Sequence, residues 1–228
     1  MESLPDDTFT GDPSWRVART MSDGTSVTIR PISPDDRDEL RRGFQHVSAQ
    51  TRYLRFLGVV GELSERMLTY LTCVDQQKHV ALVAVIASPD LKTERGVGVA
   101  RLIRLEEDPE VAEAAITVVD ELQKHGIGSA LALELERAAR ARGIRHIRAD
   151  VLEGNATMRS ILEGAGARRV DKGDSPGTIS YDIALDPAVP TRDRARRILD
   201  ILRGAAQTMA VTIRKLVPPN RTDPVRED

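Results

Sequence analysis

Gln123-Lys124-His125-Gly126-Ile127-Gly128-Ser129-Ala130 follows an apolar run and opens a long helical pattern, and this stretch decides the fold. The first turn of a helix leaves backbone N–H groups without partners, and the helix dipole adds partial positive charge there. Gly126 and Gly128 let that backbone approach an anion without a Cβ in the way. Lys124 and His125 add positive or donor character beside them. The stretch therefore predicts a cradle for a pyrophosphate group.

Three other interpretations of the glycines compete with this one. Two glycines can form a plain turn between a strand and a helix, with no ligand. A P-loop requires a lysine before its Ser or Thr, and Gly128-Ser129-Ala130 lacks it. A dinucleotide-binding fingerprint requires a third small residue where this chain has Leu131, although Asp150 lies at a suitable distance. Such a unit usually opens its domain, whereas this stretch begins at residue 123, so both nucleotide readings are disfavoured.

The pattern that fits is Gln-x-x-Gly-x-Gly at residues 123–128, at the end of a strand. It is the acetyl-CoA motif of the GNAT superfamily of N-acetyltransferases, which this chain resembles over roughly residues 25–185. The segment 112–119 resembles the fourth strand of that family, and 138–144 resembles the end of its third helix. Further segments resemble the family's first strand and helix and its asparagine motif: Thr28–Ile32 with Asp35-Asp36, and Glu153–Met158.

One more segment, Ser48–Phe56, resembles a particular branch, the bacterial protein lysine acetyltransferases of the Pat type. The resemblance implies an α/β GNAT fold with a mixed, mostly antiparallel central sheet of about six to seven strands flanked by helices. It also implies that strands four and five splay apart, so that the pantetheine arm of acetyl-CoA fits between them. The strand–helix–strand order over residues 114–152 agrees, because it requires a parallel pair in the sheet.

The local patterns predict the individual elements. Ser33 before Pro34 is typical of a helix start, and Ser64 is a typical N-cap. Alternating or β-rich runs bounded by turn signals predict strands over residues 26–32, 80–87, 96–105, 114–119, 144–152, 168–173 and 178–185. Apolar residues at helical spacing predict helices that start near residue 34 and over residues 65–72, 126–142 and 155–163.

The chain is expected to consist of one domain with two extensions. Residues 1–24 contain Pro, Gly and acidic residues with little periodicity, so we expect a disordered N-terminal extension. The acetyltransferase domain is expected over residues 25–186. Residues 187–228 are expected to form an amphipathic helix and a flexible tail. The basic, apolar-striped helix favours packing on its own domain or a homodimer contact over a membrane surface or an acidic partner.

The composition is that of an ordinary enzyme. The 228 residues are 40% hydrophobic and 30% charged, which suffices for one sizeable core. The net charge of −2 and the pI near 6.1 argue against nucleic-acid binding. No apolar run reaches the length of a membrane span, and the N-terminus does not resemble a signal peptide. We therefore expect no membrane contact and a cytoplasmic location.

The cysteine and histidine content predicts neither a disulfide framework nor a metal site. The single cysteine, Cys73, excludes an internal disulfide, and its apolar neighbours predict a buried thiol that acts as a small hydrophobe. The histidines lack the spacing of metal ligands, so we expect no metal at His46, His79, His125 or His146.

Glu113 is the candidate general base. Acetyl transfer to an amine requires removal of a proton, because lysine is almost wholly protonated near neutral pH. Glu113 is a carboxylate at the start of a mostly apolar strand, where burial beside a cofactor would raise its pKa. A solvated strand end is the alternative role. Other acidic residues lie just upstream: Glu106, Glu107, Asp108 and Glu110. The resemblance favours Glu113, because lysine acetyltransferases use a glutamate at the matching position.

The resemblance also assigns the cofactor contacts. Backbone groups that match Val118 and Val119 bind the pantetheine arm in the family, and the loop led by Gln123 holds the pyrophosphate. The loop residues are Lys124, His125, Gly126, Ile127, Gly128, Ser129 and Ala130. Asn155 matches a residue that commonly contacts the cofactor arm, although asparagine there also suits a plain N-cap. Many relatives carry a tyrosine that reprotonates the leaving thiolate, and Leu162 stands at the matching position here.

The sequence thus predicts an acetyl-CoA-dependent N-acetyltransferase that acts on a primary amine, with protein lysine as the acceptor and Glu113 as the base. Two alternatives stay open. One is an enzyme that acetylates a small amine, and the other is a non-catalytic acyl-CoA-binding module that regulates a partner. The donor site is common to all three, and the acceptor is what separates them.

Overall fold

The computed structural model describes residues 9–45, 62–87, 93–154, 156–164, 166–170 and 177–185. Its sheet contains β1 (Val17–Thr20), β2 (Ser26–Pro31), β3 (His79–Ala87), β4 (Glu94–Arg104), β5 (Val111–Val118), β6 (His146–Leu152), β7 (Arg168–Val170) and β8 (Thr178–Ala184). The helical elements are η1 (Pro34–Asp36), α1 (Arg37–Gln45), α3 (Glu65–Thr72), η2 (Asp120–Leu122), α4 (Ile127–Ala141) and α5 (Ala156–Gly164).

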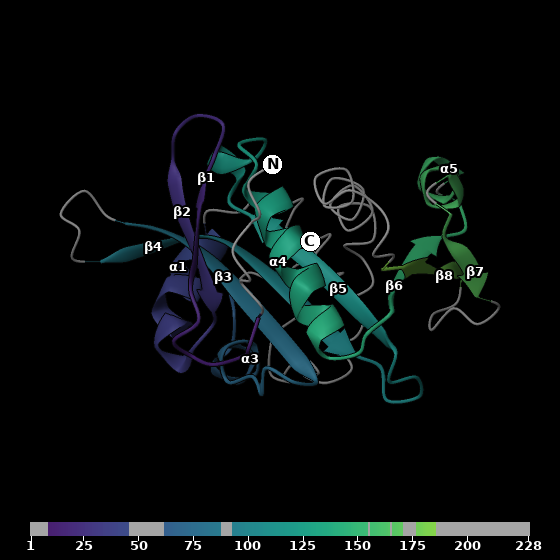
Figure 1. The fold of residues 1–228 in the computed structure, drawn as a ribbon, viewed down its shortest axis with the longest axis horizontal. Helices are drawn as coiled ribbons and strands as arrows, with labels where there is room; N and C mark the ends of the chain where they lie inside the picture. Colours follow the sequence, from purple (N-terminus) through teal and green to yellow (C-terminus); the bar gives the residue numbers. More distant parts are fainter. Residues whose placement is uncertain are drawn as a thin grey trace, which may run out of the picture.

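One sheet of eight strands runs in the order β1-β2-β3-β4-β5-β6-β8-β7 (Figure 1). The β5–β6 pair is parallel, and the other neighbouring pairs are antiparallel. This confirms the mixed, mostly antiparallel sheet that the sequence predicts. The predicted count of six to seven strands is too low, because the prediction placed no strand before residue 26.

The additional strand, β1, lies in the segment for which we expected disorder. It pairs with β2 from Val17 opposite Ile29 to Thr20 opposite Ser26. Phe9, Val17 and Met21 are buried in the main core, and their burial offsets the entropy of ordering this short segment. The expectation of disorder is therefore wrong for residues 9–24, which the structure describes.

Helices cover both faces of the sheet. On one face, α4 packs on β3, β4 and β5 and forms the main core with α5, which contributes the fully buried Leu162. On the other face, α1 and α3 enclose a smaller cluster that includes Phe44, Leu68 and Ala115. Successive residues of β5 alternate between these two cores, as expected of a strand. Residues 112 and 114 face α4, whereas Ala115 faces α1 and α3.

The parallel pair β5–β6 is short, and this shapes the centre of the sheet. Its register contains three pairs and ends with Glu113 opposite Arg148. Beyond that point β5 continues to Val118 beside β4, and β6 continues to Leu152 beside β8. The two strands therefore separate after Glu113. This is the splay between the fourth and fifth strands that the resemblance implies, shifted by one in numbering because of β1.

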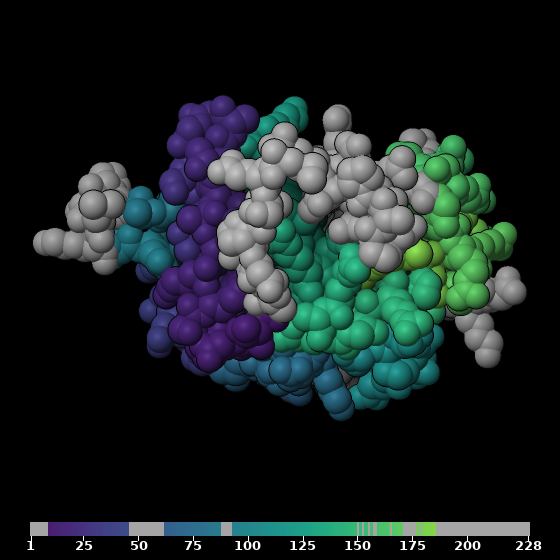
Figure 2. Space-filling model, viewed as in Figure 1, coloured from purple at the N-terminus to yellow at the C-terminus, as the bar shows by residue number. Residues whose placement is uncertain are grey.

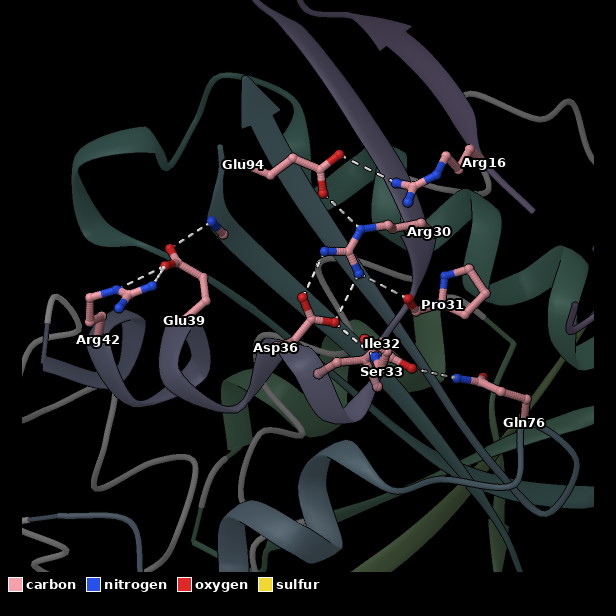
Figure 3. A network of polar contacts seen from close by, with 11 residues as sticks. Arg16, Arg30, Pro31, Ile32, Ser33, Asp36, Glu39, Arg42, Gln76 and Glu94 are labelled. Atoms are coloured by element: carbon pink, nitrogen blue, oxygen red, sulfur yellow. Dashed lines mark hydrogen bonds and ion pairs between the residues drawn. The ribbon is translucent and has the colours of Figure 1, made fainter. Parts of the chain in front are cut away.

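A polar network ties the start of α1 to the sheet (Figure 3). Arg30 on β2 donates to both carboxylate oxygens of Asp36, at 2.7 and 2.8 Å, and to Glu94 on β4. Asp36 in turn accepts from the backbone N–H of Ser33, which caps the first turn. The helix start predicted around residues 33 and 34 is thus confirmed, and a largely buried ion pair fixes its position on the sheet.

Several predictions concern the outer parts of the chain. Cys73 is exposed rather than buried, because it ends α3 at the surface. Within the described ranges, no helix is both long and apolar enough to cross a membrane, and no three potential metal-ligating side chains cluster. The Pat-like segment Ser48–Phe56 and the C-terminal segment 187–228 lie outside the described residues.

Candidate active site

The predicted pyrophosphate cradle is the first turn of α4. Gly126 is the N-cap, with φ +97°, and no side chain caps this end of the helix. The first helical hydrogen bond runs from Ala130 N–H to Gly126 C=O at 3.0 Å. The N–H groups of Ile127, Gly128 and Ser129 precede it, so they have no acceptor within the helix. Three donors and the positive end of the helix dipole therefore meet at one point.

The residues before this turn adopt an unusual backbone. Lys124 has φ +69°, which is uncommon for a residue with a side chain, and it is exposed. Gln123 folds back, and its side-chain amide donates to the carboxylate of Asp120 at 2.8 Å and to the C=O of Val118 at 3.3 Å. Gln123 thus holds the end of β5 to the loop, and its contact with the cofactor stays a prediction.

The backbone of β5 offers polar groups along the splay. Val119 N–H donates to Val97 C=O, and Leu105 N–H donates to Val111 C=O. Odd-numbered residues of this strand therefore direct their backbone groups toward β4. Because these groups alternate along a strand, those of Ile116 and Val118 point toward the side from which β6 has separated. Val118 thus presents its N–H at the splay, whereas Val119 is engaged with β4.

Glu113 lies at the vertex of the splay, which is the last position at which β5 pairs with β6. Glu113 is 2% exposed and lies on the same face of the sheet as Ala115, toward α1 and α3. The upstream alternatives in the loop before β5 differ, because Glu106, Glu107 and Glu110 are exposed and Asp108 is partly exposed. Glu113 is thus the one carboxylate of this group that is removed from water. Its role as the general base stays a prediction.

Charged residues that the sequence interpretation missed surround this vertex. Arg148, opposite Glu113 on β6, forms a bidentate pair with Asp182 on β8, at 2.8 and 3.1 Å. Arg101 on β4 is 2% exposed and donates to Leu71 C=O at 2.6 Å. The alternation of polar residues along β6 is a signal of one non-core face, but it does not reveal which partners meet across strands.

Two further predicted positions have different outcomes. Asn155 lies outside the described residues, so its role stays a prediction. Leu162, where many relatives carry a tyrosine, is fully buried in the main core. Tyr181 on β8 is also buried, and it donates its hydroxyl to Glu163 on α5 at 2.9 Å. Burial and this hydrogen bond raise the pKa of Tyr181, so it is a neutral structural group near neutral pH.

Comparisons with known proteins agree on the family. The model of the acetyltransferase (GNAT) domain matches residues 26–168. An acetyltransferase of Pseudomonas aeruginosa is 32% identical over 147 residues, which are 64% of this chain and 77% of that protein. The acetyltransferase Pat of Mycolicibacterium smegmatis is 31% identical over 183 residues, which are 78% of this chain. This chain spans only 51% of that longer protein.

A solved structure extends the match to three dimensions. The GNAT domain of S. lividans PAT superimposes with a TM-score of 0.62 at 27% identity, covering 76% of this chain and 98% of that domain. Fold, helix start and splay all agree with this class of enzyme. The chain therefore belongs to the GNAT family of acetyltransferases. Within that family it resembles the Pat branch.

Proposed function

We propose that this acetyltransferase transfers the acetyl group of acetyl-CoA to the ε-amine of protein lysine, with Glu113 as the general base. The observation that carries this proposal is the buried carboxylate of Glu113 at the last pair before β5 and β6 separate. A base at this vertex is adjacent to the gap in which the thioester of a bound acetyl-CoA would lie. Protein lysine is the proposed acceptor because this chain resembles the Pat branch, which is a branch of protein lysine acetyltransferases.

The donor side uses backbone groups. The N–H groups of Ile127, Gly128 and Ser129 suit a pyrophosphate, which is doubly charged and accepts several hydrogen bonds. The N–H and C=O of Ile116 and the N–H of Val118 suit the amides of the pantetheine arm, which can pair with a strand edge as another strand would. Together these groups define a path that starts at the first turn of α4 and follows β5 toward Glu113.

The acceptor approaches from the opposite face. Glu113 points toward α1 and α3, whereas the pyrophosphate cradle belongs to α4 on the other face. An amine on the α1 and α3 side can therefore attack the thioester without displacing the cofactor. In the transfer, Glu113 removes a proton from the ammonium, and the nitrogen bonds to the thioester carbon. As the C–S bond breaks, the nitrogen gives its second proton to water and becomes the amide nitrogen. The thiolate then takes a proton from water, since Leu162 supplies none.

Glu113→Gln tests the base. We expect kcat/KM to fall by about 10²- to 10⁴-fold, since a positioned base contributes that much, and the Kd for acetyl-CoA to stay unchanged. Glu106→Gln, which alters an exposed carboxylate of the loop before β5, is the matched control and should leave both constants unchanged.

The acceptor requires a separate measurement. Turnover of acetyl-CoA against cell lysates and an amine panel, with mass-spectrometric mapping of acetylated sites, identifies it. Transfer to small amines alone would exclude protein lysine. Tight binding of acetyl-CoA without transfer to any acceptor would instead support a non-catalytic module. Undiminished transfer by Glu113→Gln would show that another group is the base.

A further inference from the structure

The turn between β1 and β2 lies against the loop before α4, and Asp23 connects the two. One carboxylate oxygen of Asp23 accepts from Thr25 N–H at 2.9 Å, within the turn. The other oxygen lies 2.7 Å from Nδ1 of His125 in the loop. These two hydrogen bonds lower the pKa of Asp23 to about 2, so the group is a carboxylate near neutral pH. Because a carboxylate only accepts, His125 donates through Nδ1–H.

The loop that Asp23 contacts has a backbone that requires support. His125 lies between Lys124, with φ +69°, and Gly126, with φ +97°. Glycine adopts this region freely, but lysine does so only where its surroundings hold it. The hairpin also touches the backbone here, since Met21 Sδ lies 3.6 Å from the point that a Cβ on Gly126 would occupy. The hairpin therefore restricts both the side chain and the backbone of the loop.

The same N-terminal segment is attached to α4 at two other points. Arg19 on β1 donates to Glu134 in the middle of α4, at 2.7 and 3.2 Å, and the side chain of Glu134 is fully buried. Phe9 packs under the guanidinium of Arg142 at the end of α4, 4.5 Å from the ring centre. Figure 2 shows the surface of this segment beside that of α4. The hairpin thus keeps a fixed position relative to the helix, and Asp23 transmits that position to the loop.

We propose that Asp23 is a positioning residue for the cofactor: through His125 it sets the loop so that the first N–H groups of α4 face the pyrophosphate. The inference rests on the proposed function, because it requires the cradle to bind acetyl-CoA. It assigns a role to the β1–β2 hairpin, which is remote in sequence from the GNAT motif. Asp23 acts on binding of the pyrophosphate and not on the chemistry at Glu113.

Asp23→Ala tests this role by comparing two acetyl donors. We expect the KM for acetyl-CoA and the calorimetric Kd for CoA to rise about threefold to tenfold, as for loss of a partly exposed charged contact, with kcat unchanged. Acetylpantetheine lacks the pyrophosphate, so its kcat/KM should not change. Asp12→Asn is the matched control, because Asp12 is an aspartate of the same segment that bonds within its own turn, to Ser14.

A double-variant cycle separates positioning from general support. If Asp23 acts through His125, Asp23→Ala should have no further effect on the KM for acetyl-CoA in a His125→Ala background. An equal effect in both backgrounds, an unchanged KM, or an equal loss with acetylpantetheine would each overturn the inference and leave the proposed function standing. Failure of the wild-type protein to bind CoA would instead remove the proposed function, and the inference with it.

Discussion

The chemistry proposed for this protein depends on single residues and on their place on the sheet. Glu113 is buried because β5 enters the interior at the point where β6 separates from it. Arg148 stands opposite, but its charge is engaged by the buried carboxylate of Asp182. The Arg148–Asp182 ion pair thus lies on β6 and β8, the two strands that follow β5 in the sheet, beside the position of Glu113.

Gly126 gives a test at the same scale. With φ +97°, a side chain at this position is strained, and Gly126→Ala should lower the free energy of unfolding by about 1–3 kcal/mol. It should also raise the Kd for CoA, because the strained N-cap displaces the first N–H groups of α4. Gly143→Ala provides the control at the opposite end of the helix, where φ is +72°. Chemical denaturation should show a similar loss for both variants, and calorimetry a loss of CoA affinity for Gly126→Ala alone.

At the scale of elements, α4 is held at several points along its length. Its apolar side packs on β3, β4 and β5, and the N-terminal segment crosses it from Phe9 to Asp23. On the other face of the sheet, the network around Arg30 and Asp36 joins α1 to β2 and β4. Helices on both faces are thus fixed by charged contacts as well as by their cores. This rigidity suits a site built from backbone groups, which cannot adjust by changing rotamers.

The Asp36 network predicts a dependence of stability on pH. Burial would raise the pKa of Asp36, but hydrogen bonds from Arg30 and Ser33 outweigh it and hold the pKa below its ordinary value of 3.8. The stabilisation by this group is therefore complete above pH 3.8 and is lost as the pH falls through the lowered pKa.

Urea denaturation of Asp36→Asn measures this contribution. Near pH 7 the variant should be less stable than the wild type by about 2 kcal/mol, the worth of a charge-assisted hydrogen bond. The difference should shrink as the pH falls below 3.8. Asp38→Asn is the control, since its carboxylate is 71% exposed in a pair with Arg41, and it should have little effect at any pH. A constant difference for Asp36→Asn down to low pH would contradict the assignment.

At the scale of the whole molecule, the proposed site lies where two parts of the sheet are joined by a short strand pair. The sheet is paired from β1 to β5 and again from β6 to β7, and three pairs join the two parts. The polar edge that this leaves on β5 leads from the start of α4 to Glu113. In the proposed function, donor and acceptor meet at this vertex from opposite faces. The proposed active site therefore lies where a strand pair is interrupted.

Amide hydrogen exchange tests this arrangement. Binding of CoA should slow exchange in peptides that cover residues 114–119 and 123–130, because the cofactor supplies partners for N–H groups that the sheet and helix leave unpaired. At a ligand concentration a hundred times the Kd, the slowing can reach about a hundredfold. A peptide over β3, which is paired on both sides, is the internal control. Equal protection of β3 would indicate global stabilisation and not occupation of the splay.

Local sequence patterns determined much of this protein. Gly126 and Gly128 at the start of α4 and the β-rich runs of β3 and β4 predict the helix start and the strands, because these features depend on backbone sterics and local propensity. The motif from Gln123 to Gly128 indicated the GNAT family, which the matched domain confirms. The sequence patterns did not predict that residues 9–24 are ordered. β1 is short, and contacts with β2 and α4 order it, whereas its own composition does not.

The tertiary structure alone decided what surrounds the motif. The sequence places Glu113 on a strand, but only the end of the β5–β6 register shows that it stands at the vertex of the splay. The contact of Asp23 with His125 joins residues 102 positions apart, and that of Arg148 with Asp182 joins residues 34 apart. Such contacts depend on how strands and helices are ordered in space, which periodicity does not encode. The sequence determined the proposed donor site as a local motif, and the structure decided which distant charges lie against it.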